Sequence, residues 1–307
     1  MASKQTPQTP AEQHPPGLTL LHTLWGHEEG MLRKMAWSPD GRTLASPSDN
    51  IIRLWDTETG ELRLTLKGHT KTVWEVGWSP DGSTIASASS DGNILLWDAI
   101  TGKMKRSLEG HAPNVETVAI SQNTLASGAM DNTVWLWNIR SGELLFKLEG
   151  HSSNINSVAW SPDGQILASG SGDETIRLWD TNSWHVREVL EVHSAISIVA
   201  WSPDGQILAS GSYEETIRLW DAHTGALRQT LQGHSGYVEH VSFSCDGRLL
   251  ASKSDDDMVR LWRCDTWDTV VVFDDSVNSV SDSGPAFHPT MPRLSRSGFV
   301  MKLPFFS

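Results

Sequence analysis

The sequence VAWSPDGQILASGS occurs twice in this chain, at residues 158–171 and at residues 199–212. Both copies are followed two residues later by ETIRLWD, at 174–180 and 215–221. Each copy contains short runs rich in Val, Ile and Trp, separated by Pro, Gly, Asp and Ser at the distances found in β-hairpins. The stretch therefore predicts a unit of four short antiparallel strands that the chain repeats.

The same unit recurs along most of the 307 residues with a regular period. A Gly-His pair opens five units, and Val192-His193 stands in its place in another. Successive His residues of these units are 42, 42, 40, 42 and 41 positions apart, and a Trp follows each of them after 26 to 28 positions. The six pairs are His27 and Trp55, His69 and Trp97, His111 and Trp137, His151 and Trp179, His193 and Trp220, and His234 and Trp262.

A single four-stranded sheet of this kind cannot bury its two apolar faces alone, so the units must stack radially until a ring closes. These repeats resemble the WD40 repeat family, and the resemblance covers nearly all of residues 18–307. Two of the units are nearly identical to each other. In this they resemble the repeats appended to bacterial and fungal signalling proteins. The resemblance implies an all-β fold, a propeller of four-stranded antiparallel blades that binds other proteins.

The tail after Trp262 supplies a seventh, degenerate unit. Its strand-like runs are GPAFHP (284–289), RLSRS (293–297) and FVMKLPFF (299–306), which account for three strands. The fourth strand is available at the other terminus, where LTLLHTL (18–24) precedes the first Gly-His pair. The sequence therefore predicts seven blades, the last of which is built from both ends of the chain.

Composition excludes several classes of partner. The chain has 24 Lys and Arg against 37 Asp and Glu, a formal charge of −13, which argues against nucleic acid and favours a neutral or basic protein or peptide. No apolar run is long enough for a secretory signal or a membrane span. We expect a cytoplasmic, monomeric propeller over residues 18–307, with residues 1–17, rich in Pro, Gln and Thr, as a disordered tail.

Each complete unit carries a His, a Ser, an Asp and a Trp that could be mistaken for a catalytic triad. A buried indole N–H needs an acceptor and an imidazole N–H needs a carboxylate, so these groups can satisfy one another. In WD40 relatives this network links the strands of a blade. Because a nucleophile would occur once, we interpret the five sets as structural and the chain as no enzyme. The sets are His27, Ser46, Asp49 and Trp55; His69, Ser87, Asp91 and Trp97; His111, Ser127, Asp131 and Trp137; His151, Ser169, Asp173 and Trp179; and His234, Ser252, Asp256 and Trp262.

The unit of His193 departs from this pattern, because Glu214 replaces the Asp and Val192 replaces the Gly. We expect no cofactor and no metal. Cys245 and Cys264 lie in turns on the same rim of one unit, but two thiols are too few for a structural zinc site, and we interpret them as free thiols. The acidic run 255–257 lacks the alternating ligands of a calcium loop and indicates a solvated turn.

Trp184 and Trp267 stand where other units have the Gly of a tight turn, at Gly60, Gly102, Gly142 and Gly225. Two interpretations stay open. Each Trp could cover apolar surface of its own turn, or the pair could mark a second contact patch, since exposed Trp is enriched at interfaces.

The two near-identical units indicate where binding would occur. Between the His and the Trp-Asp they differ only in HSSNINSV against HSAISIV and in Gly172-Asp173 against Tyr213-Glu214, and all these positions map to one rim. That rim carries Trp, Tyr, Met and Arg, which are enriched in interface cores. The predicted partner-binding residues are Met31, Arg33, Trp74, Glu116, Met130, Asn154, Asn156, Tyr213, Tyr237 and Glu239.

The leading hypothesis is a non-catalytic scaffold or sensor module for protein interaction. A propeller that binds a small ligand or a carbohydrate is the alternative, and it would need matching pockets between blades. The rim positions differ from unit to unit, which disfavours that alternative. The chain has no Walker-type Gly-rich loop, so it carries no NTPase motif of its own.

Overall fold

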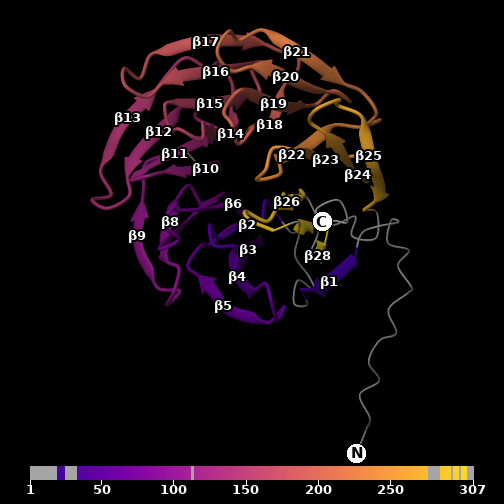
Figure 1. The fold of residues 1–307 in the computed structure, drawn as a ribbon. Coiled ribbons are helices and arrows are strands. Elements are labelled where there is room, and N and C mark those ends of the chain that lie inside the picture. The colour runs from indigo at the N-terminus through magenta and orange to yellow at the C-terminus, as the bar shows by residue number, and fades with distance from the viewer. Residues whose placement is uncertain are drawn as a thin grey trace, which may run out of the picture.

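Seven four-stranded antiparallel sheets surround a central axis like the blades of a propeller (Figure 1). The computed structural model describes residues 19–24, 33–111, 114–275, 284–291, 293–296 and 299–302, and these residues contain strands and no helix. The predicted all-β propeller with seven blades is confirmed.

The sheets follow one another in chain order. Blade one consists of β2 (Ala36–Trp37), β3 (Thr43–Ser48), β4 (Ile51–Asp56) and β5 (Leu62–Lys67); blade two of β6 (Val73–Trp78), β7 (Thr84–Ser89), β8 (Ile94–Asp98) and β9 (Met104–Leu108); and blade three of β10 (Val115–Ser121), β11 (Thr124–Ala129), β12 (Val134–Asn138) and β13 (Leu144–Leu148). Blade four consists of β14 (Ile155–Trp160), β15 (Ile166–Ser171), β16 (Thr175–Asp180) and β17 (Val186–Glu191); blade five of β18 (Ile196–Trp201), β19 (Ile207–Ser212), β20 (Ile217–Asp221) and β21 (Leu227–Leu231); and blade six of β22 (Val238–Phe243), β23 (Leu249–Ser254), β24 (Met258–Arg263) and β25 (Thr269–Asp274).

The core lies between neighbouring blades. The second strand of a blade, such as β15, is buried along its whole length, whereas the outer strands β9 and β13 expose most of their residues. Small residues in the second strand allow the next blade to approach closely. A Cβ on Gly170 would lie 2.5 Å from Ile196 of blade five, and one on Gly128 would lie 2.4 Å from Ile155 of blade four. The Ala-Ser-Gly pattern is therefore a packing requirement.

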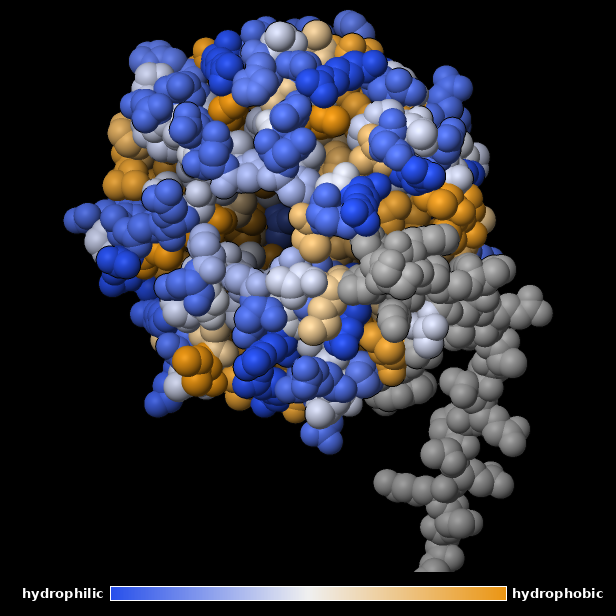
Figure 2. Space-filling view, in the orientation of Figure 1, coloured by the Kyte–Doolittle hydropathy of each residue, from blue (hydrophilic) through white to orange (hydrophobic). Residues whose placement is uncertain are grey.

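The ring has two faces. The lower face carries the turns between the first and second strands and between the third and fourth strands of each blade. The upper face carries the turns between the second and third strands and the connections from one blade to the next. Figure 2 shows the ring hollowed at its centre, with hydrophilic side chains over most of the visible face.

Blade seven is closed by both ends of the chain, as predicted. It contains β26 (Ala286–Phe287), β27 (Arg293–Arg296), β28 (Phe299–Lys302) and, as its outer strand, β1 (Thr19–Thr23). β1 pairs antiparallel with β28, with Thr19 opposite Lys302 and Thr23 opposite Phe299. This pairing leaves no open end in the ring.

Two side chains of blades one and seven strengthen the closure. Trp37 donates its indole N–H to Ala286 O and to Ser295 Oγ, both at 3.0 Å. His288 lies 3.1 Å from Gly41 O through Nε2, while its Nδ1 accepts the backbone N–H groups of Thr290 and Met291. Because Nδ1 is an acceptor, Nε2 carries the proton and donates it to Gly41.

The Trp37 contact is one example of a repeated link between blades. The Trp at the end of the first strand donates to a carbonyl in the first strand of the preceding blade. This occurs from Trp78 to Ala36 at 3.1 Å, from Trp160 to Ala119 at 3.1 Å and from Trp201 to Ala159 at 3.0 Å. Phe243 of blade six and Ile120 of blade three stand at the same position and cannot donate.

The predicted tail, residues 1–17, lies outside the described residues. Within the part of the chain that the structure describes, nothing forms a helix of the length and apolarity that a membrane span needs.

Candidate functional site

The His, Asp, Ser and Trp residues meet in blades two, three, four and six. In blade four, His151 Nδ1 lies 2.8 Å from Asp173, His151 Nε2 lies 2.8 Å from Ser169 Oγ, and the Trp179 indole N–H donates to the same Oγ at 2.8 Å. The sets of His69, His111 and His234 have the same connectivity, with distances between 2.7 and 3.2 Å. The donors run in one direction: indole N–H to Ser Oγ, Ser O–H to His Nε2, and His Nδ1–H to the carboxylate.

The Ser of this network cannot act as a nucleophile. Its connectivity to His and Asp matches a hydrolase triad, but Ser87, Ser127, Ser169 and Ser252 are all 0% exposed. Each Ser oxygen also accepts an indole N–H. The arrangement therefore links strands within a blade and offers no oxygen to a substrate.

Burial sets the charge state of the network. It lowers the pKa of His151, and the hydrogen bond to Asp173 only partly opposes this, so the imidazole is neutral. Burial raises the pKa of Asp173, but hydrogen bonds from Ser152, Thr175 and His151 outweigh it, and the pKa falls below its usual value. The same directions hold for the His and Asp of blades two, three and six.

Blade five lacks this network, in agreement with its departure in sequence. His193 is exposed and has a left-handed φ of 64°, while the neighbouring Val192 is 1% exposed. Glu214 pairs with Arg218 at 2.9 Å, and Trp220 alone donates to Ser210, at 2.9 Å. The connection before β18 is one residue shorter than that before β14, and Val192 stands where blade four has Gly150 at a φ of 146°, which a Val rarely adopts.

In blade one, Trp55 donates to Ser46 Oγ at 2.7 Å, and Asp49 lies in the β3–β4 turn. His27, the predicted fourth member of that set, and Met31, a predicted rim residue, lie outside the described residues.

The upper mouth of the central channel holds a cavity of about 200 Å³. Side chains from blades one to six line it, which is why no stretch of sequence contains the site. Six of the predicted partner-binding residues are brought together here, along with three others. The lining residues are Arg33, Lys34, Trp74, Glu116, Asn156, Ser197, Tyr213, Glu239 and His240.

Arg33 and Trp74 form one wall of this cavity. The Arg33 guanidinium lies 4.2 Å from the centre of the Trp74 ring, and the Trp74 indole N–H donates to Ser90 Oγ at 2.6 Å. Burial lowers the pKa of Arg33, against the opposing fields of Asp49 and Glu239. Trp74 is thus held in a fixed orientation, which sequence alone did not indicate.

Two carboxylates of the mouth are partly withdrawn from water. Burial raises the pKa of Glu116, and Lys34 acts in the opposite direction. Burial likewise raises the pKa of Glu239, against the field of Lys253. Lys34 is itself paired with Glu75 at 3.6 Å. A cation placed beside Glu116 or Glu239 would be favoured, because it would offset the cost of burying their charge.

An aromatic pair lies above the mouth. The rings of Tyr213 and Tyr237 are 5.4 Å apart and expose 57% and 53% of their surface. Met130, on the same face, is 51% exposed, and Asn154 and Asn156 are hydrogen-bonded to each other. Asn156 also donates to Ile196 O at 2.6 Å, which ties blade four to blade five. The face thus combines rigid polar groups with exposed aromatic surface.

Lys34 and His240 are lining residues that the sequence analysis missed. They directly follow the rim positions Arg33 and Glu239 in the chain and line the same cavity. Burial holds the pKa of His240 well below its usual value, so this ring is neutral. The signal in the sequence that could have identified them is that each is a polar residue directly after a predicted rim position.

The lower face has its own features. Trp184 and Trp267 adopt left-handed φ values of 56° and 63°, close to the 78° of Gly142 at the equivalent place. Trp184 packs against Phe146 of blade three and Trp160 of its own blade, with ring centres 5.7 and 6.1 Å away, and so covers apolar surface where these two blades meet. Cys245 and Cys264 are free thiols, and burial raises the pKa of Cys264 to about 12, which makes it unreactive.

Two protein-family models match the chain. The model described as "WD domain, G-beta repeat" matches residues 18–56, 60–98 and 225–263, and the model described as "IFT122 first beta-propeller" matches residues 91–225. The fold and the repeated network define a β-propeller built of such repeats. The chain belongs to the WD40-repeat propeller family.

Individual relatives match only part of this chain. A nuclear distribution protein PAC1-1 of Uncinocarpus reesii is 42% identical over 79 residues, which are 25% of this chain and 18% of that protein. A U5 small nuclear ribonucleoprotein 40 kDa protein of Dictyostelium discoideum is 42% identical over 67 residues, 22% of this chain and 19% of that protein. The chain thus matches less than a fifth of the length of either relative.

Proposed function

We propose that this chain is a non-catalytic scaffold or sensor module that binds a neutral or basic protein segment across the upper mouth of the channel. The observation that carries the proposal is the exposed Tyr213–Tyr237 pair beside a cavity lined by two half-buried carboxylates. Exposed aromatics next to a desolvated polar pocket are typical of interaction hot spots. The Dictyostelium relative, by its name, is part of a ribonucleoprotein, and membership of an assembly fits the same role.

The size and charge of the mouth indicate what it would take from a partner. A volume of about 200 Å³ holds a side chain or a loop tip, and it is below the roughly 300–1,000 Å³ of sites for small molecules. Glu116 and Glu239 favour a Lys or Arg, in keeping with the net charge of −13. These features support a protein partner over the alternative of a small ligand or a carbohydrate.

The proposal includes the absence of enzymatic activity and a cytoplasmic location. Support for the first comes from the burial of the network Ser residues, 0% exposed in blades two, three, four and six. Support for the second comes from the free thiols Cys245 and Cys264, which persist most readily in a reducing compartment.

The test is affinity capture by the immobilised chain, with retained proteins identified by mass spectrometry and their affinities measured on purified material. Tyr237→Ala should weaken the complex about thirtyfold or more, the effect expected for an anchor worth roughly 2 kcal/mol. Its melting temperature should change little, because more than half of Tyr237 is exposed. Trp74→Ala should also weaken binding but lower the melting temperature, since it releases Arg33 and Ser90.

Trp184→Gly is the control on the lower face. It places a Gly at a left-handed φ of 56°, as in the turns of other blades, and should leave the complex intact. A complex that survives Tyr237→Ala and Trp74→Ala but is lost with Trp184→Gly would move the site to the lower face. Retention of glycans and of no protein would favour the alternative function.

A further inference from the structure

On the lower face, the turns that join the first and second strands of the blades form a ring, and most of these turns are alike. In blades one, two, four, five and six the Asp of the turn accepts the hydroxyl of the preceding Ser, at 2.6 or 2.7 Å. The Gly that follows has a left-handed φ of 69° to 71°. A Cβ on Gly82 would lie 3.7 Å from Pro39, and one on Gly205 would lie 3.6 Å from Pro162. Each such turn therefore rests on the turn of the preceding blade.

Blade three breaks this ring. Its first two strands are joined by Gln122 and Asn123, where blade four has Pro162 to Gln165, so the turn is two residues shorter and has no Gly. Gln122 takes the left-handed conformation instead, with φ of 50°. The shorter turn does not extend over blade two as the others extend over their neighbours. A cavity of about 320 Å³ lies at this place, between blades two and three.

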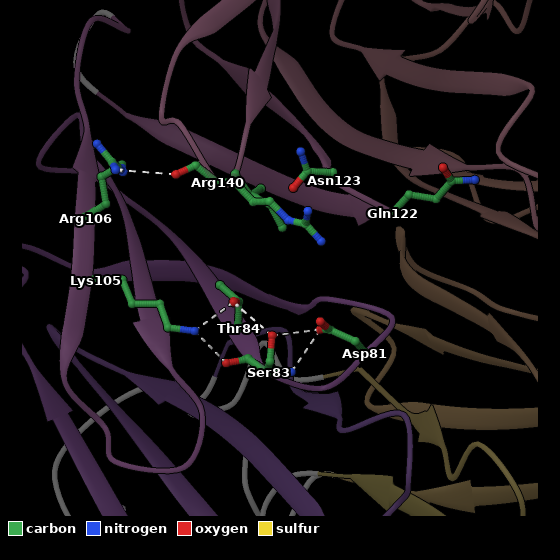
Figure 3. A pocket seen from close by; sticks show the side chains of 9 residues that line it. Asp81, Ser83, Thr84, Lys105, Arg106, Gln122, Asn123 and Arg140 are labelled. Atoms are coloured by element: carbon green, nitrogen blue, oxygen red, sulfur yellow. Dashed lines mark hydrogen bonds between the residues drawn. The ribbon is translucent and has the colours of Figure 1, made fainter.

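The lining of this cavity is polar and carries three cations. Asp81, Ser83 and Thr84 come from the β6–β7 turn and the start of β7, and Lys105 and Arg106 from β9. Blade three contributes the rest (Figure 3): Gln122, Asn123, Ile139 and Arg140. Ile139 is the one aliphatic member of this lining. The site therefore suits a charged ligand and not an apolar one.

The carboxylate of Asp81, the acidic residue of the lining, is hydrogen-bonded within its own β6–β7 turn. Asp81 accepts hydrogen bonds from Ser79 Oγ, Ser83 N and Ser83 Oγ, at 2.6, 3.0 and 2.9 Å. These bonds lower the pKa of Asp81 to about 2. Lys105 is likewise engaged, with Ser83 O at 2.9 Å, with Thr84 Oγ1 at 3.1 Å and with the carboxylate of Asp98 at 3.4 Å. The charge of Lys105 is therefore balanced by Asp98, and the two arginines are the cations of the lining left for a ligand.

The two arginines are differently placed. Arg106 crosses from blade two to blade three, donates to Arg140 O at 3.4 Å, and lies over Gly142, where a Cβ would be 2.3 Å from the Arg106 Cδ. The Arg140 guanidinium extends into the space between Asn123 and Ser83 (Figure 3). Asn123 Oδ1 is buried and, within the described residues, has no hydrogen-bond partner. The Asn123 amide is turned towards Asn138, to which its Nδ2 donates at 3.2 Å, so the groups that the cavity offers to a ligand are the two guanidinium groups.

We propose that this lower-face cavity is a binding site for a phosphate monoester. Guanidinium groups from two blades match a doubly charged oxyanion with several oxygens, whereas a carboxylate would need only one of them. The site lies on the opposite face from the Tyr213–Tyr237 pair and does not depend on the function proposed for that face.

Isothermal titration at low ionic strength, where exposed charges are least screened, tests the site. The probes are inorganic phosphate, O-phosphoserine and glutamate. We expect O-phosphoserine to bind most tightly and inorganic phosphate more weakly. Glutamate should bind at least about tenfold more weakly than O-phosphoserine, because its side-chain carboxylate carries one negative charge where the phosphate carries up to two. Equal binding of glutamate and O-phosphoserine, or no binding of any probe, would overturn the proposal.

Three variants locate the binding. Arg140→Gln should reduce affinity for O-phosphoserine about tenfold or more. Replacing Gln122-Asn123 by the Pro-Asp-Gly-Gln of blade four restores the longer turn and should abolish binding by filling the cavity. Arg187→Gln is the control for the loss of one positive charge on the same face: Arg187 donates to His223 O at 3.4 Å between blades four and five, as Arg106 does to Arg140 O, but there the longer turn is present.

Circular dichroism and thermal unfolding verify the fold of each variant. Affinity that falls as much with Arg187→Gln as with Arg140→Gln would show a diffuse charge effect and contradict the proposal. Arg140→Gln and Arg187→Gln are conservative changes of exposed side chains, so their comparison decides the outcome even if the lengthened turn fails to fold. Tyr237→Ala should bind O-phosphoserine as well as the unchanged protein, which separates this site from the upper mouth.

Discussion

At the scale of single residues, the hydrogen-bonded His of a blade can be compared with one that has lost its network. His151→Ala removes the acceptor of the buried Ser169 and a donor to the partly buried Asp173, so it should lower the free energy of unfolding by about 1–3 kcal/mol. His193→Ala should cost much less, because His193 is exposed. Urea denaturation of both variants measures the difference. A larger loss at His193 would show that the network does not stabilise the blades.

The same network predicts a pH dependence. The pKa values of His69, His111, His151 and His234 are lowered in the folded chain, so below about pH 6.5 the unfolded state binds more protons. Their stabilising contribution is present above that pH and is lost as pH falls towards the folded pKa values. The lowered Asp pKa values act in the same direction at lower pH.

We therefore expect the free energy of unfolding to decrease steadily from pH 7 to pH 5, measured by urea denaturation at constant ionic strength. His151→Ala should make the decrease shallower, since it removes one of the titrating groups. His193→Ala is the comparison, because exposure leaves that side chain outside the network. Stability that is constant or rises between pH 7 and pH 5 would contradict the assignment of neutral imidazoles.

Among residues, the members of the network could be predicted because the period of the repeat places them in register. The sequence also showed that blade five departs from the pattern, through Glu214 and the interval from His193 to Trp220 of 27 instead of 28. The outward turn of His193 could not be predicted, because it depends on how a shorter connection is accommodated by the backbone. Lys34 and His240 were missed for a similar reason: the residues that line the upper cavity come from six blades and approach one another only when the ring is assembled.

At the scale of elements, the links between first strands give a further prediction. Trp160→Phe keeps the aromatic ring but removes the N–H that reaches Ala119 O at 3.1 Å. The free energy of unfolding should fall by about 1 kcal/mol, the usual value for one hydrogen bond. Phe243→Trp supplies the missing donor at the equivalent position of blade six and should cost nothing or stabilise. Equal destabilisation by both changes would indicate that ring packing, and not the hydrogen bond, matters at this position.

The elements themselves were predicted well, because Pro, Gly and Asp separate short apolar runs at hairpin spacing. The consequence of the short turn in blade three was not predicted. Its two missing residues are visible in the interval of 26 between His111 and Trp137. A cavity at that place follows only from the contact of each turn with its neighbour, as between Gly82 and Pro39, and that contact exists only once the blades are stacked.

At the scale of the whole molecule, ring closure depends on residues far apart in the chain. The composite seventh blade could be predicted by counting strands at both termini. The contacts that fasten it could not, because Trp37 meets Ser295 across 258 positions and His288 meets Gly41 across 247, outside any repeat pattern. Closure therefore rests on β1 and on this set of side chains together.

Deletion of residues 18–24 tests the contribution of β1 to closure. The deletion removes the partner of β28 and the buried Leu24, which packs with Trp37 and Val300, so an unpaired strand edge and apolar surface become exposed. We expect a lower melting temperature and aggregation, measured by differential scanning fluorimetry and light scattering. Deletion of residues 1–15 leaves β1 intact and is the control, for which both measurements should match the full chain. If the two deletions proved equally stable and equally monomeric, β28 would not need β1, and the blades would be held in a ring by their side-chain contacts alone.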